Sequence, residues 1–317
     1  MDGLPEMSPL LTTPSRQRTI RAPIHCRGVG LHSGHQVILT LRPAPIGHGI
    51  VFRRTDLEMD IPARYDLVRD TQLCTSLTHP EQPEARVGTI EHLMAAITGV
   101  GVDNLLIEVD GPEVPILDGS SAPYVFLLEC AGLMAQDAWR PAIEILRTVR
   151  VEDGAAFAEL RPGPFGFDLA LSIDFDAPAI GRQALSLRLT DDGFRHELAS
   201  ARTFVLMGDV ARLQDAGLAK GGSLANAVIV DEDRVLNPGG LRMQDEFVRH
   251  KMLDAVGDLA LAGAPLLGRF IGHRTGHRLN SQLLHALFAN PTAWRWVEPG
   301  MASAPLGMPL QAAAARA

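Results

Sequence analysis

Residues 250–258 read His-Lys-Met-Leu-Asp-Ala-Val-Gly-Asp, and this stretch predicts a helix with one polar face. At about 100° per residue, the side chains of His250, Lys251, Asp254 and Asp258 share a sector of roughly 100°, and the apolar side chains lie opposite. A His and an Asp four residues apart point the same way, so both can reach one metal ion. The alternative is an ordinary amphipathic helix that turns its polar face to water.

The bulk composition is that of a globular protein. The 317 residues are 46% hydrophobic and 21% charged, which is enough apolar material for a sizeable core, and this length favours two domains. The formal net charge of −8 argues against a nucleic-acid-binding protein that works by bulk charge. The chain has only two lysines, Lys220 and Lys251, and one of them lies in the predicted helix.

Cysteine usage and hydropathy favour a cytoplasmic protein. Cys26, Cys74 and Cys130 are widely spaced, so they suggest neither a disulfide framework nor a C-x-x-C zinc pair. No run reaches the roughly 18 apolar residues needed to span a membrane, so we expect no stable membrane insertion. Residues 1–18 do not resemble a signal peptide, and we expect a disordered leader there and a loose tail at 298–317.

Alternating apolar patterns with glycine and proline stops predict an α+β chain. We expect strands at 37–41, 49–53, 104–109, 148–151, 167–173 and 266–271, and helices at 89–97, 122–133, 246–262 and 278–288. Thr89 is the expected N-cap of the first helix. Each half contains a helix, a glycine stop and an apolar strand, which suggests two similar α+β layers facing one another. We therefore expect domain 1 at 19–133, a linker at 134–142 and domain 2 at 143–297.

A catalytic zinc site needs about three protein ligands and one open position, so a third ligand must come from outside 250–258. His92 is a candidate because Glu91 precedes it, and a carboxylate beside a metal ligand can take a proton from bound water. The H-E-x-x-H motif is absent, and the alternative is two polar residues in a first helical turn, where the helix dipole favours Glu.

Four weaker signals accompany these residues. His277, expected in a loop between a strand and a helix, can stabilise an oxyanion and protonate a leaving amine, or simply cap the helix. Asp258 is placed to hold His277 charged. Thr203 can donate to an oxyanion or be an ordinary strand residue, and the glycine-rich 220–223 lacks P-loop spacing and is better explained as a turn.

Taken together, the segments resemble the bacterial UDP-3-O-acyl-N-acetylglucosamine deacetylases of lipid A biosynthesis. The matching motifs stand in family order across about residues 19–297, at 28–34, 69–75, 89–93, 115–120, 201–204, 245–254 and 276–277. The resemblance implies an α+β fold of two similar domains, each packing helices on a sheet, with the helices meeting in the middle. It also implies a small insert in each domain, the second at about 204–237, where it forms an apolar passage for the acyl chain.

The resemblance implies a zinc-dependent hydrolase that releases acetate and the free glucosamine amine. One Zn²⁺ per chain would be bound by His92, His250 and Asp254. Glu91 is implied as general base, His277 as general acid or electrostatic partner, Thr203 as oxyanion donor and Asp258 as the residue that orients and charge-balances His277. Which of Glu91 and His277 protonates the amine stays open at this point.

Substrate contacts are implied for a further set of residues. Phe175 would stack on the uracil, and Arg274 stands where the family is expected to have a lysine, which changes the geometry of any phosphate contact. The full set implied to contact substrate is Lys251, Phe204, Phe175, Arg274, Leu31, Cys74, Met207, Val210, Ala219, Gly222, Ser223 and Leu224. Val230 is a further candidate for the passage, and the alternative for all the passage residues is that they form an ordinary small core.

The resemblance implies an acylated UDP-sugar as the partner, no nucleic acid, a monomer, and the cytoplasm of a Gram-negative bacterium. Two other functions remain to be distinguished. One is a zinc amidase with a different amide substrate, which would turn over substrates that lack the acyl chain and UDP equally well. The other is a catalytically silent binding protein, which would be expected to lack a ligand or the base.

Overall fold

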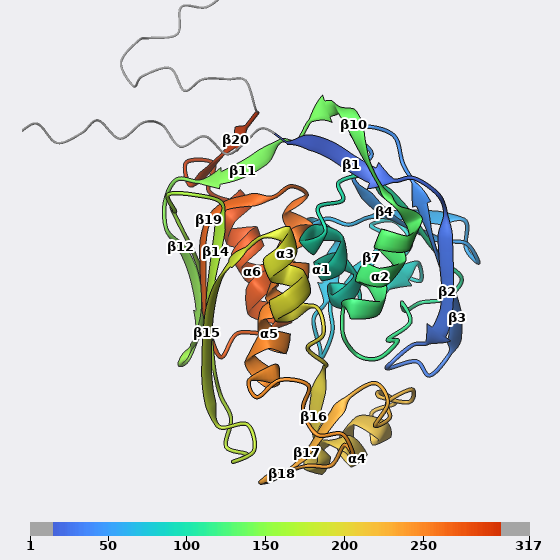
Figure 1. Cartoon of the computed structure of the whole chain (residues 1–317), viewed down its shortest axis with the longest axis vertical. Helices are drawn as coiled ribbons and strands as arrows, with labels where there is room; N and C mark the ends of the chain where they lie inside the picture. The colour runs from blue at the N-terminus through green and yellow to red at the C-terminus, as the bar shows by residue number, and fades with distance from the viewer. Residues whose placement is uncertain (1–14, 299–317) are drawn as a thin grey trace, which may run out of the picture.

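The computed structural model describes residues 15–298 and confirms the α+β class (Figure 1). Figure 1 shows helices enclosed between two large sheets, one on each side of the molecule. The five-stranded sheet has the order β2 (Ile24–Val29), β3 (Gln36–Pro43), β9 (Leu105–Val109), β4 (Ile50–Arg54) and β5 (Met59–Pro62). The seven-stranded sheet contains β12 (Val149–Asp153), β13 (Ala156–Arg161), β19 (Leu266–His273), β11 (Ala142–Ile145), β20 (Trp294–Val297), β14 (Phe167–Asp174) and β15 (Arg182–Leu189).

Three smaller sheets complete the chain. In Figure 1 the ribbon of β1 (Arg16–Ile20) and β10 (Leu133–Trp139) crosses the top. A three-stranded sheet is formed by β6 (Val68–Asp70), β7 (Ser76–Thr78) and β8 (Arg86–Val87). The segment predicted as the second insert contains β16 (Phe204–Leu206), α4 (Met207–Asp215), β17 (Val228–Asp231) and β18 (Arg234–Val235), at the bottom of the view.

The central helices are α1 (Glu91–Gly99), α2 (Ala122–Ala131), α5 (Glu246–Leu259) and α6 (His277–Phe288). Short helical segments lie at Tyr65–Leu67, Asp191–Gly193 (α3), Phe194–Leu198 and Ala260–Ala262. The strand and helix positions expected from the sequence therefore hold to within a few residues. None of the helices within 15–298 is long and apolar enough to cross a membrane.

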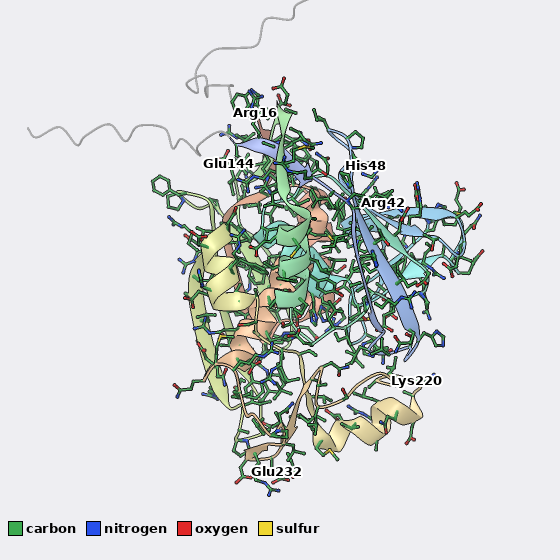
Figure 2. All side chains as sticks on the ribbon, turned by 45° about the vertical axis from the view of Figure 1, so that its right-hand side comes forward. Arg16, Arg42, His48, Glu144, Lys220 and Glu232 are labelled. Carbon is green, nitrogen blue, oxygen red and sulfur yellow. The ribbon has the colours of Figure 1, made fainter. Side chains whose placement is uncertain are left out.

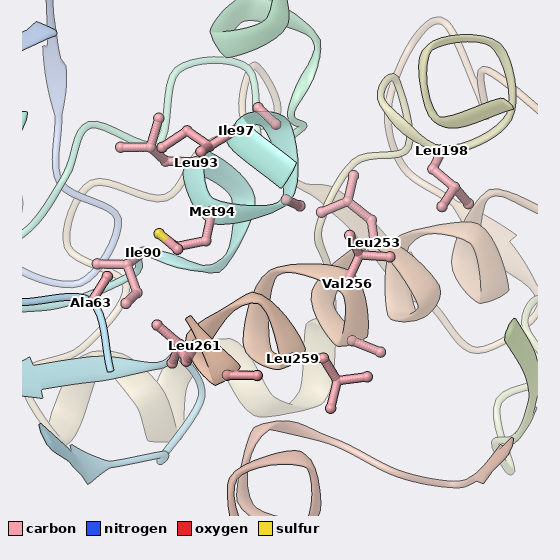
Figure 3. Close-up of a cluster of buried hydrophobic side chains, with 14 of the residues drawn as sticks. Ala63, Ile90, Leu93, Met94, Ile97, Leu198, Leu253, Val256, Leu259 and Leu261 are labelled. Atoms are coloured by element: carbon pink, nitrogen blue, oxygen red, sulfur yellow. The ribbon is translucent and has the colours of Figure 1, made fainter. Parts of the chain in front are cut away.

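Helices α1 and α5 pack directly on one another through an apolar cluster (Figure 3). Leu93 and Met94 of α1 and Leu253 and Val256 of α5 are each at most 2% exposed. Burying such side chains contributes about 1.5–3 kcal/mol each. This apolar seam fixes how the polar ends of the two helices face each other.

Gly257 allows α5 to approach the first turn of α1. A Cβ atom at this position would lie 2.0 Å from the backbone oxygen of Glu91, well inside van der Waals contact. Only glycine therefore permits the observed approach. As a result, Glu91 and His92 lie against the middle of α5.

Two expectations need correction. Thr89 does not cap α1, because it adopts a positive φ of 57° and its hydroxyl donates to Glu113 instead. The expected leader is too long, because β1 already begins at Arg16. Most of the segment expected as the linker, 134–142, forms β10 paired with β1, and its role between two domains stays a prediction. The rest of the leader, 1–14, and the tail from 299 on lie outside the described residues, and the domain boundaries stay predictions.

Candidate metal and catalytic site

The structure brings His92, His250 and Asp254 into one buried cluster. The Nε2 atoms of His92 and His250 lie 3.5 and 3.3 Å from Oδ1 of Asp254, and one ligand atom from each residue falls within 4.8 Å of the others. The three residues are 2–3% exposed. Asp258 is equally buried, so the alternative of a polar face turned to water is wrong for these positions.

The cluster fits a small divalent cation. Nδ1 of His250 lies 3.1 Å from the carbonyl oxygen of Ala201; if it carries the proton there, the lone pair of Nε2 faces Asp254. Burial lowers the pKa of His250 to about 4, which keeps the imidazole in the neutral form that binds metals. Oδ1 of Asp254 has no hydrogen-bond partner among the described residues although it is buried. Ligand atoms about 2.1 Å from a tetrahedral zinc lie about 3.4 Å apart, which is close to the distances from Asp254 to His92 and His250.

Lys251 supports the charge of the cluster. Its Nζ donates to Oδ2 of Asp254 at 2.5 Å. Burial works against the ionised form of Asp254, but His250 and Lys251 outweigh it and hold its pKa well below the usual range. Burial likewise opposes the charge of Lys251, and Asp254 outweighs it and raises the pKa of that amine. Asp254 is therefore ionised, as a metal ligand must be.

Glu91 lies beside the cluster, one residue before His92 at the start of α1. It is 3% exposed, its Oε2 accepts the backbone N–H of Thr75 at 3.0 Å, and its Oε1 lies 3.8 Å from Nε2 of His277. Burial raises the pKa of Glu91, with His277 and His92 partly opposing the rise. A carboxylate with a raised pKa is a better proton acceptor, which suits a general base.

His277 is the first residue of α6 rather than part of the preceding loop. Its Nδ1 lies 3.0 and 3.2 Å from the two carboxylate oxygens of Asp258, so the expected contact between these residues is present. Burial opposes the imidazolium, but Asp258 and Glu91 outweigh it and raise the pKa of His277 to about 9. At neutral pH His277 is therefore protonated and can donate from Nε2 toward Glu91.

Two residues that the sequence reasoning missed complete this network. The Thr75 hydroxyl donates to Oδ1 of Asp258 at 2.6 Å, and the Asn280 amide donates to Oδ2 at 2.8 Å. Thr75 thus binds Glu91 through its backbone and Asp258 through its side chain. The spacing of Asn280, three residues after His277 on a predicted helix, was the available signal, because such residues share a face.

Three of the seven non-glycine residues with positive φ in the described part of the chain lie in segments that lead into this site. Leu73, Thr89 and Arg274 have positive φ angles of 66°, 57° and 49°. Each lies two or three residues before one of the residues described above, namely Thr75, Glu91 or His277. Strained backbone of this kind costs of order 1–3 kcal/mol per residue and persists where the surrounding structure holds a site in place.

Aromatic side chains lie next to the cluster. The Phe204 ring centroid is 6.2 Å from that of His250 and 5.5 Å from that of Phe175. Thr203 is fixed by its backbone, which donates to the Gly119 carbonyl at 2.8 Å and accepts from Val228 at 2.7 Å. Phe204 thus lies beside His250 with Phe175 next to it, and Thr203 is the residue directly before Phe204 in the chain.

The expected passage residues are mostly open rather than packed. Met207 and Leu224 are 48% and 45% exposed, Gly222 and Ser223 are exposed, and Val210 and Ala219 are half-buried. The alternative that these residues form an ordinary small core is therefore wrong. It is correct for Val230, which is 1% exposed. Of the other expected contacts, Leu31 is half-buried, Arg274 is exposed, and Cys74 is buried with its pKa raised by burial to about 12.

Comparisons with known proteins match the chain to one family model and to curated proteins that carry the same name. The sequence profile of the UDP-3-O-acyl N-acetylglycosamine deacetylase family matches residues 17–289. A UDP-3-O-acyl-N-acetylglucosamine deacetylase from Idiomarina loihiensis is 51% identical over 297 residues, covering 92% of this chain and 96% of its own. Proteins of the same name from Shewanella sediminis and Actinobacillus pleuropneumoniae serotype 3 are each 48% identical, covering 94% and 89% of this chain and 98% and 93% of their own.

Proposed function

The chain belongs to the UDP-3-O-acyl N-acetylglycosamine deacetylase family, and on that basis we propose that it hydrolyses the acetamide of UDP-3-O-acyl-N-acetylglucosamine in lipid A biosynthesis. The products would be acetate and the free glucosamine amine. The observation that carries the proposal is the buried His92–His250–Asp254 cluster placed directly beside the Glu91–His277 pair. A cluster of two imidazoles and a carboxylate next to a base and a protonated acid is the set of groups that metal-assisted amide hydrolysis requires.

We propose that the cluster binds one Zn²⁺ per chain. When bound, the cation would supply Lewis acidity toward the amide carbonyl and lower the pKa of water. The neutral imidazole of His250 and the ionised Asp254 described above support this assignment. The acylated UDP-sugar as partner, the absence of a nucleic-acid partner, the monomeric state and the cytoplasmic location stay predictions from the resemblance.

The residues of this chain then divide the proton transfers between them. Glu91 accepts a proton from the attacking water, because its buried carboxylate has a raised pKa. Protonated His277 and the Thr203 hydroxyl stabilise negative charge as it develops on the carbonyl oxygen. Asp258 keeps His277 charged and fixes its ring. The amine nitrogen receives its proton from this pair, either from Glu91 after it has taken one from water or from His277.

Substrate binding is proposed for the groups around this centre. Phe175 and Phe204 offer aromatic faces to the nucleoside and sugar, and Arg274 offers an exposed cation to the phosphates. The open apolar residues of the 204–237 unit, Met207 and Leu224 among them, offer a surface for the acyl chain.

The test is acetate release from UDP-3-O-acyl-N-acetylglucosamine by the purified protein. We expect one zinc per chain by metal analysis, loss of activity on chelation, and recovery when zinc is added back. A metal-depleted protein with full turnover would contradict the metal assignment. Equal kcat/KM for UDP-N-acetylglucosamine, which lacks the acyl chain, would contradict the substrate and favour a general amidase.

A further inference from the structure

Glu113 is a buried carboxylate that lies outside the metal cluster and takes no part in the chemistry proposed above. It is 4% exposed and has no ion-pair partner in the described part of the chain. Its carboxylate instead accepts three hydrogen bonds, from the backbone N–H groups of His32 and Ser33 and from the hydroxyl of Thr89. Burying a carboxylate without a counter-ion costs free energy. The three hydrogen bonds to Glu113 offset that cost.

The first two bonds hold the turn that joins β2 to β3. His32 N and Ser33 N lie 2.9 and 2.8 Å from the two carboxylate oxygens of Glu113. A Cβ atom at Gly30 would lie 2.5 Å from Oε2 of Glu113, so the glycine gives the carboxylate room beneath the turn. Glu113 therefore fixes both the position and the shape of residues 30–34.

This turn contacts the loop at 218–222 of the 204–237 unit. Gly221 donates to the Leu31 carbonyl at 3.0 Å and Lys220 donates to the His32 carbonyl at 3.4 Å. A Cβ atom at Gly221 would lie 2.3 Å from the Gly30 oxygen, so the two backbones touch. Figure 2 marks the place through Lys220, at the edge of the lower unit. The same loop includes Ala219 and Gly222, which are proposed to contact the acyl chain.

The third bond reaches the start of α1. Thr89 donates to Oε1 of Glu113 at 2.7 Å while holding its backbone at a φ of 57°. It lies two residues before Glu91 and three before His92. The Glu113 carboxylate therefore binds two segments at once. One is the 30–34 turn, which supports the proposed acyl-binding loop, and the other is the segment that leads into the proposed base Glu91 and the proposed ligand His92.

We infer that Glu113 is a positioning residue with two separable effects: its bonds to the 30–34 turn set the acyl-binding loop, and its bond to Thr89 sets the first turn of α1. The kinetic part of this inference rests on the proposed function, and the structural part does not. Glu113→Gln replaces one acceptor oxygen by an NH₂ donor, so at least one of the three bonds must be lost.

The experiment compares three variants. For Glu113→Gln we expect faster amide hydrogen exchange at 30–34 and 218–222, with zinc content unchanged. The ratio of kcat/KM for the long-acyl substrate to that for UDP-N-acetylglucosamine should fall at least tenfold, with part of the loss in kcat. Thr89→Val should lower kcat and leave this ratio near the wild-type value. Gly221→Ala should lower the ratio and leave kcat on the acyl-free substrate unchanged.

Glu159→Gln is the matched control, because Glu159 is also buried, at 2% exposed, but binds Arg150 and Arg161 in the seven-stranded sheet. It should change neither the ratio nor exchange at 218–222. A folded Glu113→Gln protein with the wild-type ratio would overturn the inference, and if Glu113→Gln does not fold, an unchanged ratio in Gly221→Ala would overturn it. A wild-type protein without deacetylase activity would contradict the proposed function rather than this inference. In that case, amide hydrogen exchange at 218–222 in Glu113→Gln would still test whether Glu113 positions the loop.

Discussion

At the scale of single residues, the chemistry of the site depends on two carboxylates in different surroundings. Glu91 accepts one backbone N–H and has a pKa raised chiefly by burial. Asp258, four residues beyond Asp254, accepts bonds from Thr75, His277 and Asn280. The first carboxylate is thus prepared to take a proton, and the second orients His277 and raises the pKa of its imidazole.

Glu91→Gln is expected to keep the bound metal and lose most of the rate. The amide keeps the size of the side chain but cannot accept a proton at neutral pH, so kcat should fall by roughly 100-fold or more. Metal content per chain and acetate release measure the two effects. A variant that turned over at the wild-type rate would remove Glu91 as the base.

The alkaline limit of activity should report on His277. Its pKa is raised to about 9, so activity that needs the imidazolium should be constant below that value and fall as pH rises through it. Because the folded-state pKa is the higher one, the stability that this charge contributes is present below about pH 6.5 and is likewise lost toward pH 9.

Asp258→Asn removes the principal charge that stabilises the His277 imidazolium and should move the alkaline limit of kcat toward neutral pH. An unmoved limit would show that another group titrates there.

At the scale of elements, the site depends on the crossing of α1 and α5. The apolar seam that includes Leu93 and Val256 brings the helices together, and Gly257 lets them touch where Glu91 and His92 begin α1. The sequence predicted both helices and the polar face of α5. It did not predict that Gly257 makes the contact, because nothing in one chain's sequence says which glycine faces a neighbouring backbone.

Gly257→Ala is expected to destabilise the protein and to disturb the site together. The added methyl group meets a backbone oxygen that cannot rotate away, so the helices must separate, at a cost of about 3 kcal/mol in the free energy of unfolding. Gly208→Ala in α4 is the control, since a Cβ atom there meets nothing within 4 Å and alanine favours a helix by about 1 kcal/mol. Chemical denaturation measures both, and equal stability of the two variants would contradict the close-contact argument.

At the scale of the whole molecule, the proposed metal ligands come from distant parts of the chain. His92 lies on α1, which comes between β5 and β9 of the five-stranded sheet in chain order, whereas His250 and Asp254 lie on a helix that packs beside the seven-stranded sheet. Sequence periodicity put His250 and Asp254 on one face of α5 as candidate ligands, and left an ordinary water-facing helix as the alternative. His92 was a candidate third ligand because Glu91 precedes it, but its assignment to this site came from the family resemblance, because periodicity describes one element at a time and leaves contacts between elements undetermined.

We therefore expect bound zinc to stabilise the folded protein as well as to activate the proposed enzyme. A ligand bound only by the folded state adds about 2.7 kcal/mol when its concentration is 100 times Kd. We expect Tm to rise with zinc concentration in the wild type and to be independent of zinc in His92→Ala. Calorimetry with and without a chelator tests this prediction. A wild-type Tm that does not change with zinc concentration would contradict binding at this cluster.

The scarcity of lysine noted in the sequence has a consequence for labelling chemistry. Lys220 is exposed, whereas the side chain of Lys251 is 17% exposed and its amine is held charged by Asp254. An amine-directed dye or cross-linker reacts with the unprotonated form, so Lys220 should be the fastest-reacting side-chain amine of the protein. Because Lys220 sits on the loop supported by the 30–34 turn, one unmodified wild-type amine would place a fluorescent reporter beside the proposed acyl-binding surface, without any engineered cysteine.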